Sequence, residues 1–272
     1  MVKILTVKVL KYSLYLLICW GSLAGVEAQK TKAKPATKPM TLKVMTFNIH
    51  HGENNIGKTN LNRVVELVKE YKPDFVALQE IDSVVPRSGK LNQMRILSLL
   101  SDYHSAFSAA IDLQGGKYGL GILSKRPIEH VQKLKLPNPD STEQRILMCV
   151  LVPLSEGKSI RFCNTHLDHK SALNRGLQAA IINESLQNSI YPVILGGDFN
   201  ATADNHTLEA LIKYWNDAGT NSTQATYPGN GKRIDYFWTH QSAPFKVVEY
   251  KVLDEPTASD HLPVLVTYSF SK

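Results

Sequence analysis

Apolar runs of strand length alternate with short polar segments along most of the chain. Several of these runs are nearly continuous in Val, Ile and Leu, which is typical of strands covered on both faces. The pattern predicts strands at Leu42–Ile49, Phe75–Ile81, Ser105–Ile111, Gly119–Ser124, Ile128–Leu136, Ile146–Leu154, Ile160–His166, Val193–Gly197, Ile234–Trp238, Phe245–Val252 and Val264–Phe270.

Apolar residues at helical spacing fill four of the gaps between these runs. The first of these patterns stops before Pro73, because the residue before a proline avoids the helical region. The predicted helices cover Leu61–Val68, Met94–Leu100, Ala172–Leu186 and Leu208–Trp215.

The order of these elements favours a mixed α/β (α+β) fold. Leu147 to Phe162 predicts an antiparallel hairpin, whereas Val44 to Leu78 predicts a strand-helix-strand unit. A doubly wound sheet would alternate strands and helices throughout, and this chain does not. We therefore expect two mixed β-sheets packed face to face, with helices on both outer faces.

Residues 1–28 have the features of a secretion signal peptide. Three lysines precede an apolar run, Leu14–Leu23, that is short for a membrane span, and Val26-Glu27-Ala28 offers a cleavage site. An uncleaved membrane anchor is the alternative. The Lys-, Ala-, Thr- and Pro-rich residues 29–40 predict a disordered linker, and residues 41–272 form the predicted catalytic domain. We expect an exported monomer without stable membrane insertion after cleavage.

The basic balance of the chain comes from its first segment. The chain has 31 Lys and Arg residues against 24 Asp and Glu residues. Seven of the basic residues and one of the acidic residues precede Thr41. This leaves 24 basic and 23 acidic residues in the predicted domain. Because the domain is almost neutral, its charge gives no argument for a dedicated nucleic-acid binder.

Two cysteines remain after the signal segment, Cys149 and Cys163. They lie on neighbouring apolar runs, so a cross-strand disulfide is geometrically possible. Directly paired strands seldom carry a disulfide, and free cysteine is often buried. We expect two buried thiols.

Six short polar segments stand at the ends of predicted strands. Strand ends in a packed scaffold are stiff, so polar groups fixed there can converge on one point. The segments are Phe47-Asn48-Ile49-His50, Leu78-Gln79-Glu80, Asn164-Thr165-His166-Leu167-Asp168, Gly196-Gly197-Asp198-Phe199-Asn200, Arg233-Ile234-Asp235-Tyr236 and Ser259-Asp260-His261.

Glu80 and Asn48 are candidate ligands of a divalent cation. Mg²⁺ prefers oxygen ligands and takes one or two carboxylates, so Mg²⁺ or Mn²⁺ is the expected ion. Glu80 as a salt-bridged core residue and Asn48 as a turn former are the alternative. His166, Asp168 and His169 form a short cluster that keeps a zinc site open.

Candidate catalytic groups follow the other strands. Asp198 and Asn200 follow Gly196-Gly197 and are suited to orient a water and to bind a phosphate oxygen, with an Asx turn as the alternative. A histidine such as His261, held by a carboxylate, suits acid–base work near neutral pH, and Asp235 is a candidate for that carboxylate. His166 is a further candidate for contact with the leaving oxygen or the phosphoryl group.

Two other reaction classes lose support from the sequence. It contains no Gly-x-x-x-x-Gly-Lys-Ser/Thr phosphate loop and no Gly-x-Ser-x-Gly nucleophile elbow. A nucleotide-cofactor enzyme and a covalent serine mechanism are therefore disfavoured.

In order and spacing these segments resemble those of the endonuclease/exonuclease/phosphatase superfamily, which includes DNase I-like nucleases, sphingomyelinases and inositol-polyphosphate phosphatases. The similarity runs from about Leu42 to Tyr268 and rests on Thr46-Phe47-Asn48, Leu78-Gln79-Glu80, Tyr118–Ser124, Gly197-Asp198-Phe199-Asn200, Arg233-Ile234-Asp235-Tyr236 and Ser259-Asp260-His261-Leu262-Pro263. It implies a four-layered α/β sandwich and a metal-dependent phosphoester hydrolase.

The resemblance also implies residue roles. Asn48, Glu80 and Asp260 would surround the metal, and Asp198 and Asn200 would position water and substrate. Asp235 would orient His261 as general base. The Thr165-His166 pair is similar to that of DNase I-like and sphingomyelinase-like members, and the Asn-x-Tyr-x-Pro-Asn pattern of abasic-site endonucleases is absent.

The substrate stays open at this stage among nucleic acid, a phospholipid headgroup and a small phosphate ester. Arg87, in the segment Asp82–Gln93, and Asp168 are candidate substrate ligands, with a solvated loop as the alternative for that segment. A catalytically silent envelope binding protein is the alternative function. Asn200-Ala201-Thr202 is a glycosylation sequon within the candidate site, which favours a bacterial exported protein, periplasmic or extracellular.

Overall fold

The computed structural model describes residues 39–270 except Asn55 and Glu156. The predicted signal peptide and residues 29–38 of the predicted linker lie outside this range. The first strand begins at Met40, one residue before the predicted start of the domain. Within the described residues, no helix is both long and apolar enough to cross a membrane.

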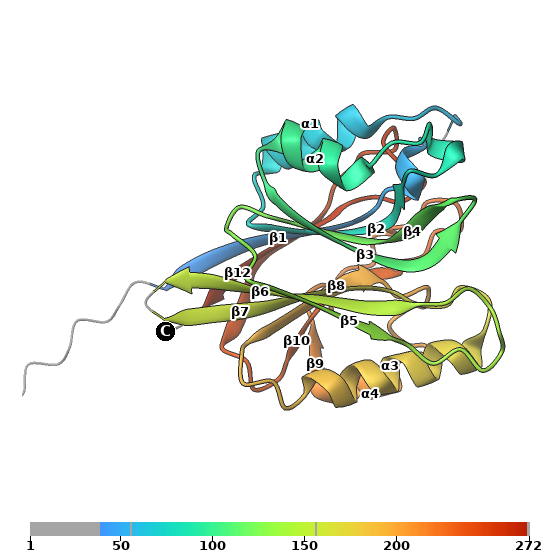
Figure 1. Cartoon of the computed structure of the whole chain (residues 1–272). Coiled ribbons are helices and arrows are strands. Elements are labelled where there is room, and N and C mark those ends of the chain that lie inside the picture. Colours follow the sequence, from blue (N-terminus) through green and yellow to red (C-terminus); the bar gives the residue numbers. More distant parts are fainter. Residues whose placement is uncertain (1–38, 55, 156, 271–272) are drawn as a thin grey trace, which may run out of the picture. The chain divides into compact units, whose positions relative to one another are not determined.

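Two six-stranded sheets face each other in the described unit (Figure 1). The first has the order β11-β12-β1-β2-β4-β3, and the second the order β5-β6-β7-β8-β10-β9. The strands are β1 Met40–Asn48, β2 Phe75–Ser83, β3 His104–Leu113, β4 Gly116–Ser124, β5 His130–Lys135, β6 Ile146–Ser155, β7 Lys158–His166, β8 Val193–Asp198, β9 Trp215–Asp217, β10 Asp235–His240, β11 Phe245–Val252 and β12 Val264–Phe270.

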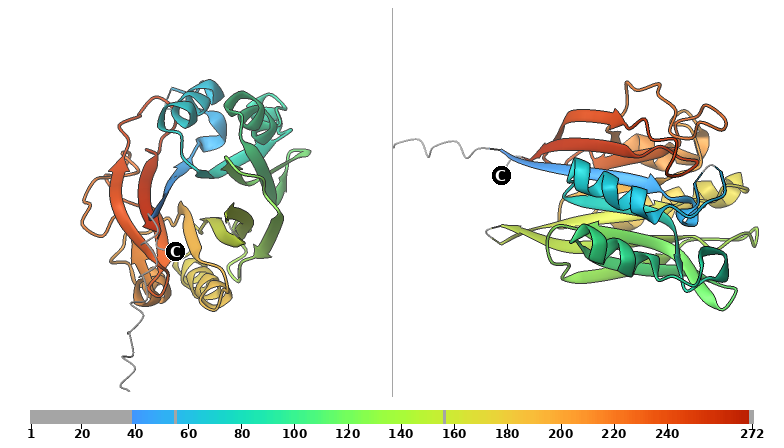
Figure 2. Two further views of the ribbon diagram at one scale, coloured as in Figure 1. Left: turned by 90° about the vertical axis from the view of Figure 1, so that its left-hand side faces the viewer. Right: turned by 90° about the horizontal axis from the view of Figure 1, so that it is seen from above.

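Helices cover the outer face of each sheet. The helices α1 (Leu61–Tyr71) and α2 (Gln93–Ser101) lie side by side over the first sheet, as Figure 2 shows from above. The helices α3 (Ala172–Leu186) and α4 (Glu209–Tyr214) pack on the second sheet. Short 3-10 helices complete the elements, η1 His50–Gly52, η2 Pro86–Ser88 and η3 His206–Leu208. The predicted four-layered sandwich is confirmed.

Each sheet is mixed in the way the sequence predicted. The pairs β1/β2 and β7/β8 are parallel and every other pair is antiparallel. The strand-helix-strand unit from Val44 to Leu78 and the hairpin from Leu147 to Phe162 are both present. Because a crossover helix joins parallel strands, the polar ends of β1 and β2 lie at the same edge of the sheet.

Continuous apolar strands follow from burial on both faces. In β1, Leu42 and Val44 pack between the sheets with Phe75, whereas Met45 and Phe47 pack under α1 and α2. A third cluster fills the space between the second sheet and its helices. Both strand faces are therefore removed from water, and the alternation typical of half-exposed strands is absent.

A buried polar link joins the two sheets next to the candidate site. The Nε2 of Gln79 on β2 donates to Oδ1 of Asn164 on β7 at 2.7 Å and to Oγ1 of Thr46 at 3.1 Å. The Nδ2 of Asn164 donates back to the carbonyl oxygen of Leu78 at 2.8 Å. Since unpaired buried amides are costly, this network fixes the ends of β2 and β7 against each other.

The predicted helix over Leu208–Trp215 is wrong at its end. It ends at Tyr214, and Trp215 opens the edge strand β9, where it lies opposite His240. The indole Nε1 donates to Oδ1 of Asn183 on α3 at 3.0 Å, and the ring is 2 % exposed. The pairing with His240 and the hydrogen bond to Asn183 therefore decide the conformation of Trp215. Neither partner can be identified from the local sequence.

The expectation of two buried thiols is also wrong, because Cys149 and Cys163 form a disulfide. They stand directly opposite each other on β6 and β7, with Cα atoms 4.0 Å apart. Non-hydrogen-bonded pairs are the closest pairs in an antiparallel ladder, so two such cysteines are within reach of each other. Whether Cys149 and Cys163 form such a close pair depends on the register of β6 against β7, which the sequence does not give.

We predict that this disulfide stabilises the fold by about 3 kcal/mol, because closing a loop of this size removes entropy from the unfolded chain. Urea unfolding of wild type with and without reductant measures the difference, and the C149A/C163A variant is the control. Its midpoint should not respond to reductant. Equal midpoints for oxidised and reduced wild type would contradict the prediction.

Candidate active site

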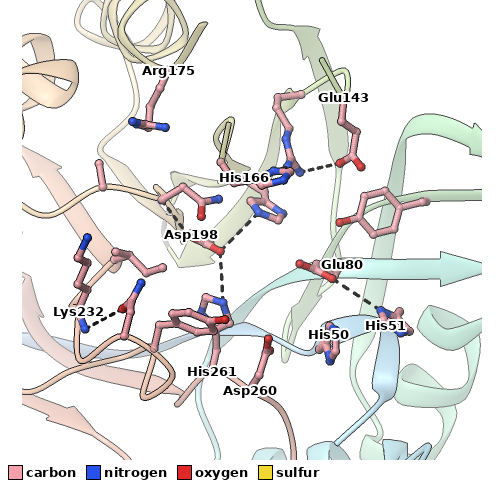
Figure 3. Close-up of a pocket in the computed structure, with 18 of the residues that line it drawn as sticks. His50, His51, Glu80, Glu143, His166, Arg175, Asp198, Lys232, Asp260 and His261 are labelled. Carbon is pink, nitrogen blue, oxygen red and sulfur yellow. Dashed lines mark hydrogen bonds and ion pairs between the residues drawn. The ribbon is translucent and has the colours of Figure 1, made fainter. Parts of the chain in front are cut away.

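The polar strand ends of both sheets line one cavity of about 830 Å³ (Figure 3). Seven of the residues predicted from the sequence contribute to its wall, Glu80, Arg87, His166, Asp198, Asn200, Asp260 and His261. Asn48 and Asp235 lie behind this wall, each 1 % exposed, and contact its members. The structure thus brings groups separated by up to about 210 positions to one place.

Unusual backbone conformations aim several of these side chains. The pairing of β2 with β4 skips between Leu78 and Ile81, and Glu80 sits in this bulge with a φ of 61°. A bulge re-aims a side chain, and here it turns the carboxylate into the cavity. Asn200 has a φ of 51°, and Gly197 has a φ of 150° where a Cβ would meet the carbonyl oxygen of Thr165 at 2.1 Å. Only glycine fits that position.

Asp198 is the centre of the site. Its Oδ2 accepts from Nδ2 of Asn48 at 3.1 Å and faces Nε2 of His166 at 3.4 Å and Nε2 of His261 at 3.7 Å. Its Oδ1 accepts from the backbone N–H of Asn200 at 2.9 Å, which is the Asx turn considered for this segment. Burial, followed by the charge of Asp235, raises the pKa of Asp198 to about 7.

His261 and Asp235 form a buried pair. Nδ1 of His261 lies 2.9 Å from Oδ2 of Asp235, so Nε2 faces the cavity. Burial alone would lower the pKa of His261, but the charges of Asp235 and then Asp198 outweigh it and raise the pKa to about 10. The ring of Tyr227 lies against the imidazole with a centroid distance of 4.8 Å. This contact was not predicted.

His166 differs from His261 in charge. Burial, together with the positive charge of Arg145, lowers the pKa of His166 well below the usual value of 6.5. Its imidazole is therefore neutral at neutral pH and offers an N–H rather than a proton for transfer.

The site gathers more negative charge than it neutralises. Within the described residues, no Lys or Arg nitrogen lies within 4.0 Å of the carboxylates of Glu80, Asp198, Asp235 or Asp260. Of the basic side chains in the described range, histidines alone come within this distance, at Glu80, Asp198 and Asp235. Among the described residues, the basic side chain that approaches Glu80 is His51, whose Nδ1 lies 3.8 Å from Oε2. Burial would raise the pKa of Glu80, but the nearby imidazole of His51 and the hydrogen bond from Asn48 are among the effects that lower it, so the group is ionised.

These oxygen donors fit a hard divalent cation. Glu80 and Asp260 both line the cavity, and Figure 3 shows their carboxylates directed into the same part of it. Asn48 is hydrogen-bonded through both ends of its carboxamide, since Oδ1 accepts from the N–H of His50 at 3.0 Å and Nδ2 donates to Glu80 Oε1 at 3.1 Å. It thus links Glu80 to Asp198, and its oxygen keeps one lone pair.

Asp168 is not placed as the sequence suggested. Its Oδ1 accepts from the N–H groups of Lys170 and Ser171, and its Oδ2 accepts from Thr142 and Asn174. With both oxygens engaged and 1 % of the residue exposed, it anchors the start of α3 and does not line the cavity. This corrects its assignment as a substrate ligand. The zinc site kept open by the sequence is also not found, because no metal-ligand cluster of the described chain consists of His166, Asp168 and His169.

Arg87 lines the cavity but is already paired. Its Nε and Nη2 donate to both oxygens of Asp82 at 2.9 Å, and Asp82 is fully buried. Arg87 therefore presents part of a neutralised pair to the cavity.

Further lining residues were missed from the sequence because they follow no strand-end motif, namely His51, Glu143, Arg145, Arg175, Tyr227 and Lys232.

Comparisons with solved structures support the fold. The endonuclease/exonuclease/phosphatase from Beutenbergia cavernae is 23% identical, with a TM-score of 0.72 over 85% of this chain and 72% of that one. The mannosyl-6-phosphatase Bt3783 of Bacteroides thetaiotaomicron is 20% identical, with a TM-score of 0.69 over 84% of this chain and 100% of that one.

Sequence comparison finds a relative and a matching family model. The uncharacterized protein YbhP of Escherichia coli (strain K12) is 27% identical over 176 residues, which cover 60% of this chain and 68% of YbhP. The model of the Endonuclease/Exonuclease/phosphatase family, whose members are phosphoester hydrolases, matches residues 45–261, which include every strand end described above. The chain belongs to this family.

Proposed function

We propose that the chain is an exported hydrolase of phosphoester bonds that depends on Mg²⁺ or Mn²⁺ and uses water as the nucleophile. The observation that carries the proposal is the His261–Asp235 pair, which faces Asp198 inside a cavity that also holds Glu80 and Asp260. An acid–base pair beside unneutralised carboxylates is a sufficient set for this slow reaction.

Glu80 and Asp260 would hold the cation, with Asn48 as a supporting neighbour. When bound, the cation supplies positive charge to the phosphoryl oxygens. The donor set consists of carboxylate and carboxamide oxygens, which favours Mg²⁺ or Mn²⁺ over zinc at this position.

His261 acts as the general base in its neutral form, and the charge of a bound cation would lower its pKa from the raised value of the metal-free site. Its Nε2 lies 3.7 Å from Asp198, beyond a hydrogen bond, so it is available to a water that Asp198 also contacts. As the water oxygen attacks phosphorus in line with the leaving oxygen, its proton passes to Nε2. The Asp235 carboxylate at Nδ1 stabilises the imidazolium that forms.

His166 and Asn200 bind the phosphoryl group. A neutral His166 donates its N–H to a phosphoryl oxygen, which agrees with its lowered pKa. Asn200 donates one N–H to the carbonyl oxygen of Leu167 at 3.0 Å, and this bond fixes the carboxamide at the cavity wall. All groups required for catalysis are present, which favours an enzyme over a silent binding protein.

Export is supported by two features of the site and the fold. Asn200 of the sequon lines the cavity, so a glycan there would fill it, and bacterial export without this modification avoids the conflict. The Cys149–Cys163 disulfide suits an oxidising compartment such as the periplasm.

The proposal is tested with plasmid DNA, RNA, sphingomyelin and small phosphomonoesters, each with Mg²⁺ and with EDTA. We expect hydrolysis of at least one class with Mg²⁺, loss of turnover in EDTA and recovery when Mg²⁺ is returned. Failure to hydrolyse any class with Mg²⁺ or Mn²⁺ would reject the enzyme and favour the binding protein.

His261→Ala should lower turnover of the hydrolysed substrate by a factor of about 100 or more, because general-base catalysis is typically worth that much. His206→Ala is the matched control, since His206 is exposed on η3 and does not line the cavity. It should retain wild-type rate. A His261→Ala enzyme that keeps more than about a tenth of the rate would remove His261 from the mechanism.

The charge of His261 should depend on the cation. In EDTA, NMR titration of its imidazole should give a pKa far above 6.5, and Asp235→Asn should lower it because the main raising charge is removed. Mg²⁺ should also lower it, through repulsion. Because the folded-state pKa is raised, the imidazolium stabilises the metal-free fold fully below pH 6.5, and this contribution disappears toward pH 10. A pKa of His261 that stays the same both in Asp235→Asn and on addition of Mg²⁺ would refute this electrostatic assignment.

A further inference from the structure

His50, His51 and Glu53 form a second cluster of metal-ligating groups beside the cavity. Each offers one ligand atom, and these atoms all lie within 4.8 Å of one another. The three residues belong to η1 and its C-terminal flank, directly after β1 ends at Asn48. The mechanism proposed above uses none of them.

The backbone of this segment is held in a rare conformation. His50 and His51 have φ values of 46° and 44°, and two consecutive residues other than glycine in the left-handed region are uncommon. Such conformations cost free energy and cluster at functional sites. Their effect is to place the two rings edge to face, with centroids 4.4 Å apart, on the same side of the loop as Glu53.

The imidazole nitrogens are poorly satisfied for buried groups. Nδ1 of His50 and Nδ1 of His51 are buried and make no hydrogen bond to any residue that the structure describes. Nε2 of His51 lies 3.3 Å from Oε2 of Glu53, and its Nδ1 lies 3.8 Å from Oε2 of Glu80. Figure 3 shows His50 and His51 next to Glu80 at the cavity wall.

We propose that His50, His51 and Glu53 bind a borderline divalent cation of the zinc type, next to the hard-cation position at Glu80 and Asp260. Two imidazoles and one carboxylate are a zinc-like donor set, and three protein ligands leave a further position open. Glu80, which belongs to the hard-cation position, also lies 3.8 Å from Nδ1 of His51 in the proposed zinc position. The proposal concerns metal binding alone and stands whether or not the chain hydrolyses phosphoesters.

The test measures zinc retained per chain after dialysis against Zn²⁺ in excess Mg²⁺, which occupies the oxygen-donor position. Wild type should retain one zinc. His50→Asn, His51→Asn and Glu53→Gln should each lower zinc affinity about tenfold or more, since weaker second-shell changes already cost 10- to 100-fold. Asparagine is chosen because it tolerates positive φ, and Glu53 is 38% exposed, so its replacement leaves the fold intact.

Two control variants locate the zinc. His169→Ala removes a histidine of the same cavity and of the alternative His166–Asp168–His169 cluster, and it should bind zinc as wild type does. Asp260→Asn should abolish phosphoester hydrolysis but keep the zinc, which separates this proposal from the proposed function. No zinc in wild type, zinc lost in His169→Ala, or unchanged zinc in both His51→Asn and Glu53→Gln would each overturn the assignment.

Discussion

An excess of carboxylate charge in a confined cavity is the constraint on which this site depends. Glu80, Asp198, Asp235 and Asp260 meet there, and within the described chain no Lys or Arg comes within 4.0 Å of them. Two like charges 4 Å apart repel by about 4 kcal/mol near a protein surface. Burial and then the charge of Asp235 raise the pKa of Asp198, and the charges of Asp235 and Asp198 raise that of His261, whereas a cation would relieve the repulsion among the carboxylates directly.

The scaffold holds these charges together. The Gln79–Asn164 link ties β2 of one sheet to β7 of the other, one residue before Glu80 and two residues before His166. The bulge at Glu80 and the close approach at Gly197 then turn the side chains into the cavity. Strain at these positions is sustained by the packed layers on both sides, because a buried sheet over-determines its backbone.

Sequence reasoning reached the fold because its signals were local. Both faces of β1 are buried, so its apolar run is continuous, and Pro73 marks the end of α1. Strand-end motifs also found Glu80, Asp198 and His261. Cys149 and Cys163 were expected as thiols because directly paired strands seldom carry a disulfide, and the register that sets their Cα atoms 4.0 Å apart was not in the sequence. Asp168 shared a motif with His166, yet its two oxygens are taken by the loop that starts α3.

The most direct test of a cation among these carboxylates is anomalous diffraction from crystals soaked in Mn²⁺. We expect an anomalous peak in contact with the carboxylates of Glu80 and Asp260. A fully soaked crystal with ordered Glu80 and Asp260 but no peak in contact with either carboxylate would contradict the account.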